Sequence, residues 1–412
     1  MPAQASSRSK RAVIIGGGAA GVFCAVNAAR MHPGLEVILL EKSARLLSKV
    51  QVSGGGRCNL THQETDIARM SRSYPRGEHF VRKAFHQFFT TDTISWFSGR
   101  GVPLKTEADG RMFPVSDSSR SVIDCLLREA GRYQVQLRMQ ADVRAVERTG
   151  DRFLVHLAGG QPLEADAVCV ACGGLPKAAQ FAWLERLGHP IEPPVPSLFT
   201  FNLPGHPLRE LMGLSVEDAR VRVTGTSLEQ RGPVLVTHWG LSGPAVLRLS
   251  AWGARLLAER QYRFQVQVNW VPGYPEPELR QVFRRVRETS GSRRVYNRNP
   301  PGLPQRLWEF LAGQAAIGSD LRWADLNAAR QNHLIRLLVQ QTLEVQGKTT
   351  FKEEFVTAGG IRLSDVDPAT MQSRIVPGLF FAGEVLDVDG VTGGYNFQHA
   401  WTSGFIAARH LG

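Results

Sequence analysis

The sequence predicts an α/β fold: a Rossmann-type domain with a doubly wound, mostly parallel sheet, interrupted by an insertion. Three observations predict it. A strand-helix-strand pattern with a glycine-rich turn occupies residues 12–41, buried strands return at 168–171 and 378–383, and the chain between these two strands changes character. A chain of 412 residues allows two or three domains of roughly 100–200 residues each.

The order of these patterns sets the expected domains. Residues 1–10 are small, polar and basic, and we expect them to be disordered. Residues 11–194 and 352–412 form one discontinuous domain, and a proline-rich stretch near its first boundary is typical of a domain crossing. The insertion is expected to contain a small β-barrel over 195–275 and a helical subdomain over 276–351.

Periodicity predicts further elements. Apolar residues at helical spacing predict helices over 80–99, 121–133 and 396–411. Alternating residues predict two strands between 135 and 157, and short strands at 219–224 and 262–268 within the insertion.

The chain is basic, with 49 Lys and Arg against 37 Asp and Glu and a formal charge of +12. Such a surplus attracts polyanions, of which nucleic acid is the commonest in a cell, but a generally basic surface gives the same numbers. The most apolar stretch, 12–29, imitates a signal peptide, yet glycines interrupt it. We therefore expect a cytoplasmic protein without a membrane span.

The five cysteines are an odd, sparse set, which fits a reducing cytosol. Cys169 and Cys172 form a CxxC, which is typical of a redox pair or a metal site. The apolar residues around them predict a buried strand, on which residues three apart face opposite sides. Two small core residues are the favoured interpretation, and no metal ion is expected.

The first motif is Gly16-x-Gly18-x-x-Gly21, between the first predicted strand and helix. Gly16 allows a tight turn, Gly18 lets a pyrophosphate approach the backbone, and Gly21 lets helix and strand pack closely. The free N–H groups at the helix start suit phosphates. Glu41 ends the next strand, where a carboxylate accepts ribose hydroxyls and disfavours a 2′-phosphate. The motif therefore predicts FAD or NAD rather than NADP.

The second motif runs from Lys49 to Asn59, with three consecutive glycines before Arg57 and Cys58. Glycines let the backbone lie against a flat ring or a phosphate, and Arg57 suits a pyrophosphate or an anionic reduced flavin. A purely structural loop is the alternative.

The third motif follows the last predicted strand as Gly383-Glu384 and continues through the glycines before Tyr395. It lies at the carboxyl edge of the sheet, where such folds bind ligands. Glu384 suits a ribityl hydroxyl, and the start of the last helix suits negative charge on a reduced flavin. A simple NAD dehydrogenase needs neither the second nor the third motif, so together the motifs predict a Rossmann-type FAD-binding domain. The residues expected to bind FAD are Gly16, Gly18, Ala20, Gly21, Glu41, Lys42, Lys49, Ser53, Gly54, Gly55, Gly56, Arg57, Cys58, Val143, Cys172, Gly173, Gly383, Glu384, Gly393, Gly394, Tyr395, Asn396 and Phe397.

Four stretches, 16–21, 53–59, 237–244 and 383–396, resemble the bacterial HI0933-like (BaiN/RdsA) family of flavoproteins. The resemblance implies an FAD domain interrupted by a small β-barrel and a helical insert. It also implies an NAD(P)H-dependent reductase of activated C=C bonds, in steroid-like enones or in uracil of ribosomal RNA. No second GxGxxG follows a predicted strand in the middle of the sequence, so NAD(P)H is expected to bind transiently.

The expected chemistry is hydride delivery to a conjugated C=C–C=O unit, followed by protonation of the neighbouring carbon. Cys58 and Tyr395 are the candidate proton donors, because both are expected beside the flavin; a merely packed residue is the alternative for Cys58. His238, in the insertion, is expected to be structural. Other functions stay open: a small-molecule enone reductase, an amine oxidase that uses oxygen, or a non-enzymatic, FAD-stabilised factor that binds RNA or the ribosome.

The segment Arg280–Arg298 holds seven arginines and one acid, with Phe283 and Tyr296 interleaved. Arginines neutralise phosphates and aromatic rings stack on unpaired bases, so this segment is the expected nucleic-acid contact if the substrate is RNA. A solvated helix face is the alternative. The sequence indicates no oligomeric state.

Overall fold

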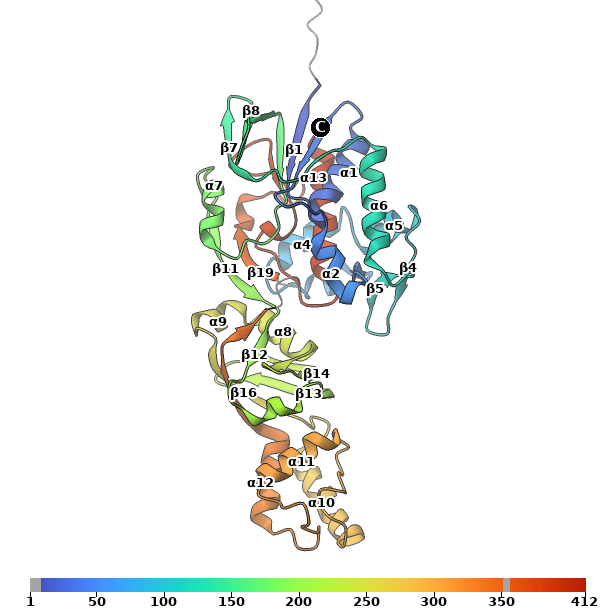
Figure 1. The fold of residues 1–412 in the computed structure, drawn as a ribbon, viewed down its shortest axis with the longest axis vertical. Helices are drawn as coiled ribbons and strands as arrows, with labels where there is room; N and C mark the ends of the chain where they lie inside the picture. The colour runs from blue at the N-terminus through green and yellow to red at the C-terminus, as the bar shows by residue number, and fades with distance from the viewer. Residues whose placement is uncertain (1–8, 351–355) are drawn as a thin grey trace, which may run out of the picture. The chain divides into compact units, whose positions relative to one another are not determined.

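The structure, a computed structural model, describes residues 9–350 and 356–412 (Figure 1). Most of the expected disordered N-terminus, residues 1–8, and the segment 351–355 lie outside the described residues. Within the described part of the chain, no helix is long and apolar enough to cross a membrane.

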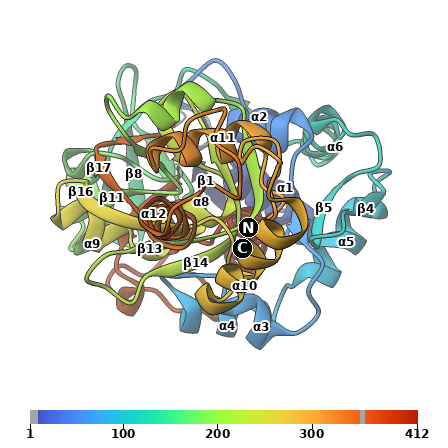
Figure 2. The same ribbon diagram turned by 90° about the horizontal axis from the view of Figure 1, so that it is seen from below.

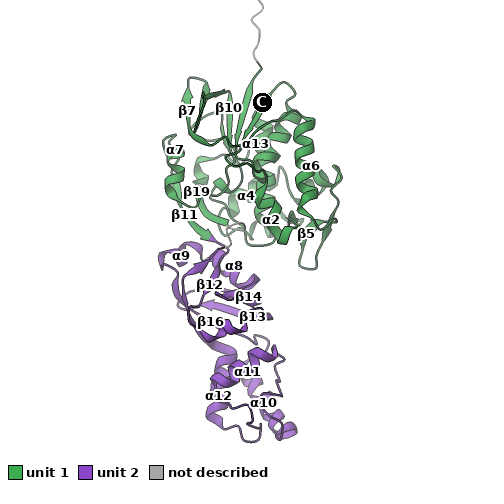
Figure 3. Cartoon of the chain, in the orientation of Figure 1, with its two compact units in different colours: residues 1–196, 352–412 green, residues 197–351 purple. Residues whose placement is uncertain are grey.

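The chain divides into two compact units, residues 1–196 with 352–412 and residues 197–351 (Figure 3). The first unit is built on a five-stranded parallel sheet. In spatial order its strands are β20 (Leu379–Phe381), β10 (Ala167–Val170), β1 (Arg11–Ile15), β2 (Glu36–Leu40) and β6 (Gln136–Arg138). The central strands are apolar and buried almost throughout, as in a sheet that is covered on both faces. The predicted Rossmann-type α/β fold is confirmed.

Helices α1 (Ala19–Met31) and α13 (Tyr395–His410) pack against each other although they come from opposite ends of the chain. Gly404 permits the close approach, because a Cβ there would lie 2.7 Å from the Ala20 carbonyl oxygen. The rings of Phe23 and Trp401 also meet in this contact, with centroids 5.2 Å apart. The contact fixes α13 to the first strand-helix-strand unit, and α6 (Ser119–Arg132) lies along the same side (Figure 1).

The stretch 80–99 differs from its predicted single helix. It forms α4 (Glu78–Phe85) and α5 (Thr90–Ser98). The break occurs at Phe89, whose backbone N–H donates to the Asp92 carboxylate at 2.7 Å and so begins a new helix.

Smaller sheets also belong to the first unit. β7 (Val143–Thr149) and β8 (Arg152–Leu157) form the predicted hairpin. The proline-rich stretch forms β11 (Ile191–Ser197), which pairs with β19 (Val356–Ile361) in a two-stranded sheet. Prolines are tolerated there because a short edge pairing needs few backbone donors.

The second unit contains a seven-stranded sheet and three longer helices. In spatial order the strands are β17 (Gln341–Gln346), β16 (Arg263–Asn269), β13 (Ser215–Val223), β14 (Glu229–Val236), β15 (Gly240–Ser242), β12 (Thr200–Asn202) and β18 (Lys348–Thr349). The helices α10 (Glu276–Ser290), α11 (Gln305–Gln314) and α12 (Ala328–Gln340) lie side by side (Figures 1 and 2).

The expected helical subdomain over 276–351 was wrong at its C-terminal end. Residues of β17 alternate between buried and exposed positions and pair with β16. That alternation has period two, which is the period of a strand with one buried face. The sheet of the second unit therefore contains strands that precede α10–α12 in the chain and strands that follow them.

Candidate active site

The glycines of the first turn meet different surroundings. A Cβ on Gly16 would lie 2.4 Å from the Ala171 carbonyl oxygen, and one on Gly21 would lie 1.9 Å from the Gly16 carbonyl oxygen. A Cβ on Gly18 would meet no atom within 4 Å. Gly16 and Gly21 are therefore fixed by packing, whereas Gly18 borders open space at the start of α1, which has no side-chain cap. This arrangement suits a pyrophosphate on the helix N-terminus.

Glu41 follows β2, and two backbone groups orient its carboxylate. Oε2 accepts from the Gly17 N–H at 2.8 Å and Oε1 accepts from the Ser43 N–H at 2.8 Å. Each oxygen keeps another lone pair, so the carboxylate can still accept ribose hydroxyls. The segment leading to Val143 is held beside it, because the Ala141 N–H donates to the Glu41 carbonyl at 2.9 Å.

Cys172 lies among the charged groups at this end of the site. Burial raises the pKa of its thiol to about 12; the carboxylates of Glu384 and Glu41 act in the same direction, and Lys42 acts against them. The next residue, Gly173, has a φ of +76°, and a Cβ there would meet no atom within 4 Å. These predicted residues therefore converge at the carboxyl edge of the sheet.

Glu384 connects the second motif to the third. Its Oε2 accepts from the Lys49 Nζ at 2.7 Å, and its Oε1 accepts from the Thr357 N–H at 2.8 Å. The Thr357 hydroxyl is buried and has no partner among the described residues. A buried hydroxyl without a partner costs free energy, so it fits a site that a polar ligand completes.

The glycines of the second motif turn the chain at the end of α2 (Ser48–Gly56). Gly54, Gly55 and Gly56 have φ values of +58°, +68° and +84°, in the left-handed region that favours glycine. A Cβ on Gly54 would lie 2.8 Å from the Phe113 ring, but Gly55 and Gly56 border open space. The backbone therefore requires these glycines, and two of them also offer a surface without side chains.

The side chains of Arg57 and Cys58, which follow the glycines, contact other parts of the protein. The Cys58 side chain is completely buried in the hydrophobic core, and burial raises the pKa of its thiol to about 12. The Arg57 guanidinium donates to the Glu107 carboxylate at 2.6 Å and lies 4.0 Å from the centre of the Phe113 ring. The Cys58 thiol thus has no surface for a ligand, and a cofactor contact by Arg57 would compete with its ion pair.

Asn59 joins the second motif to the third. In the amide orientation that satisfies its hydrogen bonds, its oxygen accepts from the Gly394 N–H at 3.0 Å and its nitrogen donates to the Thr61 carbonyl at 3.1 Å. Strand β3 (Thr61–His62) then places the His62 ring on Tyr395, with centroids 4.8 Å apart and planes at 24°. Neither Asn59 nor His62 was among the predicted site residues. Asn59 closes the Arg-Cys-Asn motif, which was the available signal, whereas no local pattern marks His62.

Helix α13 begins at Tyr395 without a side-chain cap, because its N-cap is Gly394 with a φ of +94°. The N–H groups of a first turn lack intrahelical partners, and the positive end of the helix dipole lies there. The Tyr74 hydroxyl donates to the Tyr395 carbonyl at 2.6 Å. The Asn396 amide closes the preceding turn by accepting from and donating to Gly390 at 2.8 and 2.9 Å. Asn396 therefore holds the turn, and Tyr395 with the first helical turn forms a rigid polar edge.

Two residues of α13 hold the backbone of Gly383, just before Glu384. The Gly383 N–H donates to the Ser403 hydroxyl at 2.9 Å, and the His399 Nε2 lies 3.3 Å from the Gly383 carbonyl oxygen. Burial lowers the pKa of His399 to about 4, so the ring is neutral and donates from Nε2. The predicted residues Gly393 and Phe397 lie on the same turn and helix, with the Phe397 ring stacked 5.8 Å from that of Trp401.

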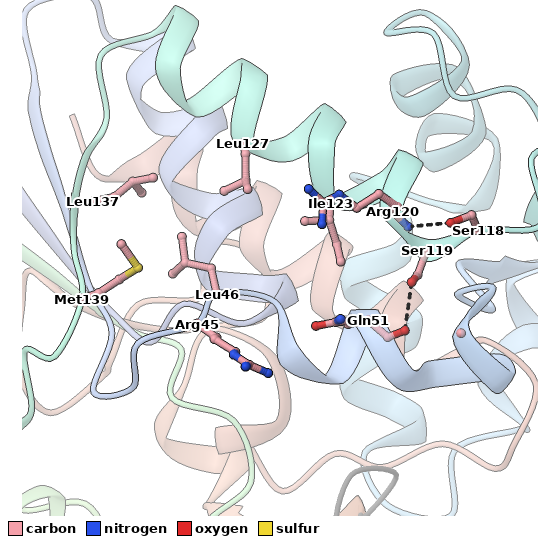
Figure 4. A pocket seen from close by; sticks show the side chains of 11 residues that line it. Arg45, Leu46, Gln51, Ser118, Ser119, Arg120, Ile123, Leu127, Leu137 and Met139 are labelled. Carbon is pink, nitrogen blue, oxygen red and sulfur yellow. Dashed lines mark hydrogen bonds between the residues drawn. The ribbon is translucent and has the colours of Figure 1, made fainter.

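A cavity of about 850 Å³ lies between α2, α6 and the end of β6 (Figure 4). Leu46, Ile123 and Met139 contribute to its apolar lining, and the Ser119 hydroxyl donates to the Gln51 carbonyl at its edge. Of the predicted site residues, Gly56 alone lines it. The cavity adjoins the glycine loop but does not include the surfaces at Gly18, Gly55 or Gly173. Across the described ranges, no group of His, Cys, Asp and Glu side chains is arranged to hold a metal ion.

The predicted nucleic-acid segment Arg280–Arg298 is only partly available. Phe283 is completely buried, with its ring 5.0 Å from that of Trp323, so the expectation that it stacks on a base was wrong. Its position on α10 has helical spacing with other core residues, which buries it. Arg287 donates to the Leu326 carbonyl at 2.6 Å, and Arg280 and Arg294 form ion pairs. The exposed arginines of the segment without a side-chain acceptor among the described residues are Arg284, Arg285, Arg293 and Arg298.

Three comparisons place the chain among known proteins. It is 31% identical over 406 residues to a protein of Clostridium scindens named 3-dehydro-bile acid delta(4,6)-reductase, covering 96% of this chain and 97% of that protein. It is 30% identical over 416 residues to an Escherichia coli protein named ribosomal RNA dihydrouridine synthase, covering 97% of each. A solved structure, 3-ketosteroid delta1-dehydrogenase from Sterolibacterium denitrificans, shares the fold with a TM-score of 0.52 at 13% identity, covering 97% of this chain and 98% of that one.

The family follows from a match to most of the chain. Residues 10–410 match the model described as the HI0933-like protein Rossmann domain. The glycine surfaces, the Glu41 carboxylate and the buried Thr357 hydroxyl, which lacks a partner among the described residues, fit the FAD that the three motifs predicted. The chain therefore belongs to the HI0933-like family and is an FAD-dependent oxidoreductase.

Proposed function

We propose that the protein reduces a C=C bond conjugated to a carbonyl, with electrons from NAD(P)H, and that uracil in ribosomal RNA is its substrate. The observation that carries the reductase proposal is the polar edge at the start of α13. There the Asn59 amide links the glycine loop to Gly394 at 3.0 Å, and Tyr395 and the uncapped first turn follow at once. Such an edge suits both negative charge and a proton donor.

Different residues of the chain suit different parts of the cofactor. Bound FAD supplies a hydride when its ring is reduced. Gly18, the N-terminus of α1 and Glu41 suit the ADP half, while Lys49 and Glu384 suit the ribityl chain and pyrophosphate. The first turn of α13, which has no side-chain cap, would stabilise negative charge on a reduced flavin.

A proton must also reach the substrate carbon beside the carbonyl. We assign this role to Tyr395, because its half-buried phenol lies at the helix start, whereas the Cys58 thiol is completely buried. His62, stacked on Tyr395, orients the phenol ring. NAD(P)H is proposed as a transient donor, since the sequence has no second GxGxxG turn for a resident nicotinamide cofactor.

Charge favours RNA as the substrate. Residues 197–351 carry 20 Lys and Arg against 12 Asp and Glu, which accounts for +8 of the chain's +12. Four exposed arginines of Arg280–Arg298 remain for phosphates. The C5=C6 bond of uracil is conjugated to the C4 carbonyl, so it is a bond of the proposed class, and an E. coli relative is named for making dihydrouridine.

A small-molecule enone is the second candidate substrate. The relative named as a bile acid reductase is as similar to this chain as the relative named for ribosomal RNA, at 31% and 30% identity. Both names describe saturation of a C=C bond, so the reaction class holds for either substrate.

The test uses the FAD-loaded protein under anaerobic conditions. We expect NADPH or NADH to bleach the flavin absorbance, and ribosomal RNA lacking dihydrouridine to restore it while uridines gain two hydrogens by mass spectrometry. Restoration by a steroid enone and not by RNA would select the second candidate. Bleaching by an amine instead of NAD(P)H, with recovery by oxygen and release of hydrogen peroxide, would make the protein an amine oxidase. A flavin that NAD(P)H does not bleach would contradict the reductase proposal. A map of dihydrouridine in ribosomal RNA from cells with and without the gene completes the test.

A further inference from the structure

The tip of the hairpin between β14 and β15 exposes two rings on a rigid backbone. Trp239 is 44% exposed, although large apolar side chains are usually covered. The adjacent His238 ring lies 4.7 Å from the Trp239 ring at 44°. Both rings belong to the second unit, and the oxidoreductase chemistry of the first unit uses neither of them.

The backbone beneath these rings is held at several points. The Thr237 N–H donates to the Gly240 carbonyl at 2.7 Å, and the Leu203 N–H donates to the Trp239 carbonyl at 2.9 Å. Gly240 is required here, because a Cβ would lie 2.2 Å from the Phe201 carbonyl oxygen. A tip that is already rigid loses little conformational entropy when a partner stacks on it.

A cationic group lies beside the rings. The Arg209 Nε donates to the His238 carbonyl at 2.6 Å, while its terminal nitrogens have no acceptor among the described residues. Met212, 60% exposed, follows in the same segment, next to Gly213, whose N–H donates to the Val236 carbonyl at 2.9 Å. Stacking rings, a soft apolar side chain and a guanidinium therefore gather at one end of this sheet.

We propose that Trp239 and His238 form a platform on which an unpaired base of an RNA stacks, with Arg209 beside it for the phosphate. This assignment rests on the proposed RNA substrate. Charge favours RNA over a protein partner, because the second unit has an excess of basic residues and these are almost entirely arginine, with 19 Arg and one Lys. Base stacking on aromatic rings combined with arginine contacts is how single-stranded nucleic acid is commonly bound.

The test measures binding of a fluorescein-labelled single-stranded oligouridylate to the FAD-loaded full chain by fluorescence anisotropy. Trp239→Ala should weaken binding about tenfold, within the range for loss of one base stack, with an unchanged dependence on salt. Trp239→Phe should restore most of the affinity. The matched control is Trp252→Ala, since Trp252 is 41% exposed on the same unit at the end of α8 (Pro244–Trp252) and should leave binding unchanged.

An oligonucleotide with abasic sites in place of the uridines separates the contribution of base stacking from that of phosphate charge. Wild type should bind it more weakly than the oligouridylate, and Trp239→Ala should bind both equally. If Trp239→Ala and Trp252→Ala bind the oligouridylate alike, the platform is wrong. If Trp239→Ala weakens only turnover of a small enone or only capture of a protein, the occupant is wrong. Loss of RNA affinity in Trp239→Ala without any uridine reduction by wild type would keep the platform and contradict the proposed reaction. Reduction of uridines by Trp239→Ala at the wild-type kcat/KM would support the proposed reaction and contradict the platform.

Discussion

Arg76 and Asp389 form an ion pair with two hydrogen bonds between side chains that are 9% and 0% exposed, although 313 positions separate them in the chain. The Val391 N–H donates to the Ser73 carbonyl at 2.9 Å in the same contact. The segment around Arg76 therefore holds the glycine turn that leads into α13. The polar edge at Tyr395 depends on this turn, so the ion pair helps to fix the position of that edge.

Replacing Arg76 by Leu should destabilise the protein by about 3–5 kcal/mol, because Asp389 would keep its buried charge and lose this guanidinium. We expect FAD to be retained poorly by the fraction that folds. Urea unfolding followed by circular dichroism measures the first effect, and the flavin-to-protein absorbance ratio measures the second. The double variant Arg76→Leu/Asp389→Leu should recover part of the stability; a double variant as unstable as the sum of the single ones would mean that the pair is not coupled.

Gly18→Val and Gly21→Val should fail in different ways. Gly18 has a φ of −81° and open space around a Cβ, so Gly18→Val should fold with near wild-type stability and purify without yellow flavin. Gly21→Val should prevent folding, since its Cβ would lie 1.9 Å from the Gly16 carbonyl oxygen. Thermal melting and the flavin spectrum of the purified variants check both. A stable Gly18→Val with full flavin would refute the assignment of this turn.

Tyr395→Phe and Cys58→Ala separate the two candidate proton donors. Removal of the phenol should slow reoxidation of the reduced protein by substrate about 10²-fold or more, with FAD still bound. Cys58→Ala should leave that rate unchanged and cost about 1 kcal/mol of stability, because the thiol is completely buried in the core. Stopped-flow measurement of flavin absorbance gives both rates. Slow reoxidation of Cys58→Ala with a normal rate for Tyr395→Phe would identify Cys58 as the proton donor.

The neutral His399 should make the protein less stable in mild acid. Its folded pKa of about 4 lies below the unfolded value of roughly 6.5, so between these values the unfolded chain binds more protons than the folded one. Stability from this group is therefore complete above pH 6.5 and is lost as the pH falls towards about 4, by up to roughly 3 kcal/mol. His399→Gln keeps a donor for the Gly383 carbonyl and should flatten this loss between pH 7 and 4.5 in urea titrations. His79→Gln, at an exposed position, should not.

The sequence predicted those parts of the site that are coded locally. The turn at Gly18 and the carboxylate of Glu41 follow from one short strand-helix-strand unit, whose spacing is fixed by its own geometry. The contact of Asn59 with Gly394 and the stack of His62 on Tyr395 could not be predicted in this way. Each joins positions more than 330 apart in the chain, and the pairing depends on how α13 packs against α1.

Burial explains the two residues whose roles changed. Cys58 lies two residues after three glycines and was expected beside the flavin, but its side chain is completely buried in the core. Phe283 was counted with the arginines around it, yet it shares the apolar stripe of α10 with Leu279 and Val286. A sequence gives the spacing of such residues but not which face of the turn or helix meets the core.

The free arginines of the second unit give the last prediction, which concerns salt. Arg284, Arg285, Arg293 and Arg298 are exposed and without a side-chain acceptor in the described ranges, so their charges are available for phosphates. Each phosphate contact to a single strand contributes about 0.7 to the slope of log K against log salt concentration. Replacing all four by Ser should therefore lower the slope for oligouridylate binding by roughly 2–3 while the protein stays folded. Arg287→Ser is the contrasting variant: its guanidinium holds the Trp323 and Leu326 carbonyls, so its loss should lower the melting temperature with a smaller effect on the slope. An unchanged slope in the fourfold variant would mean that the exposed arginines of Arg280–Arg298 are only solvated, and the case for RNA would then rest on the Trp239 platform alone.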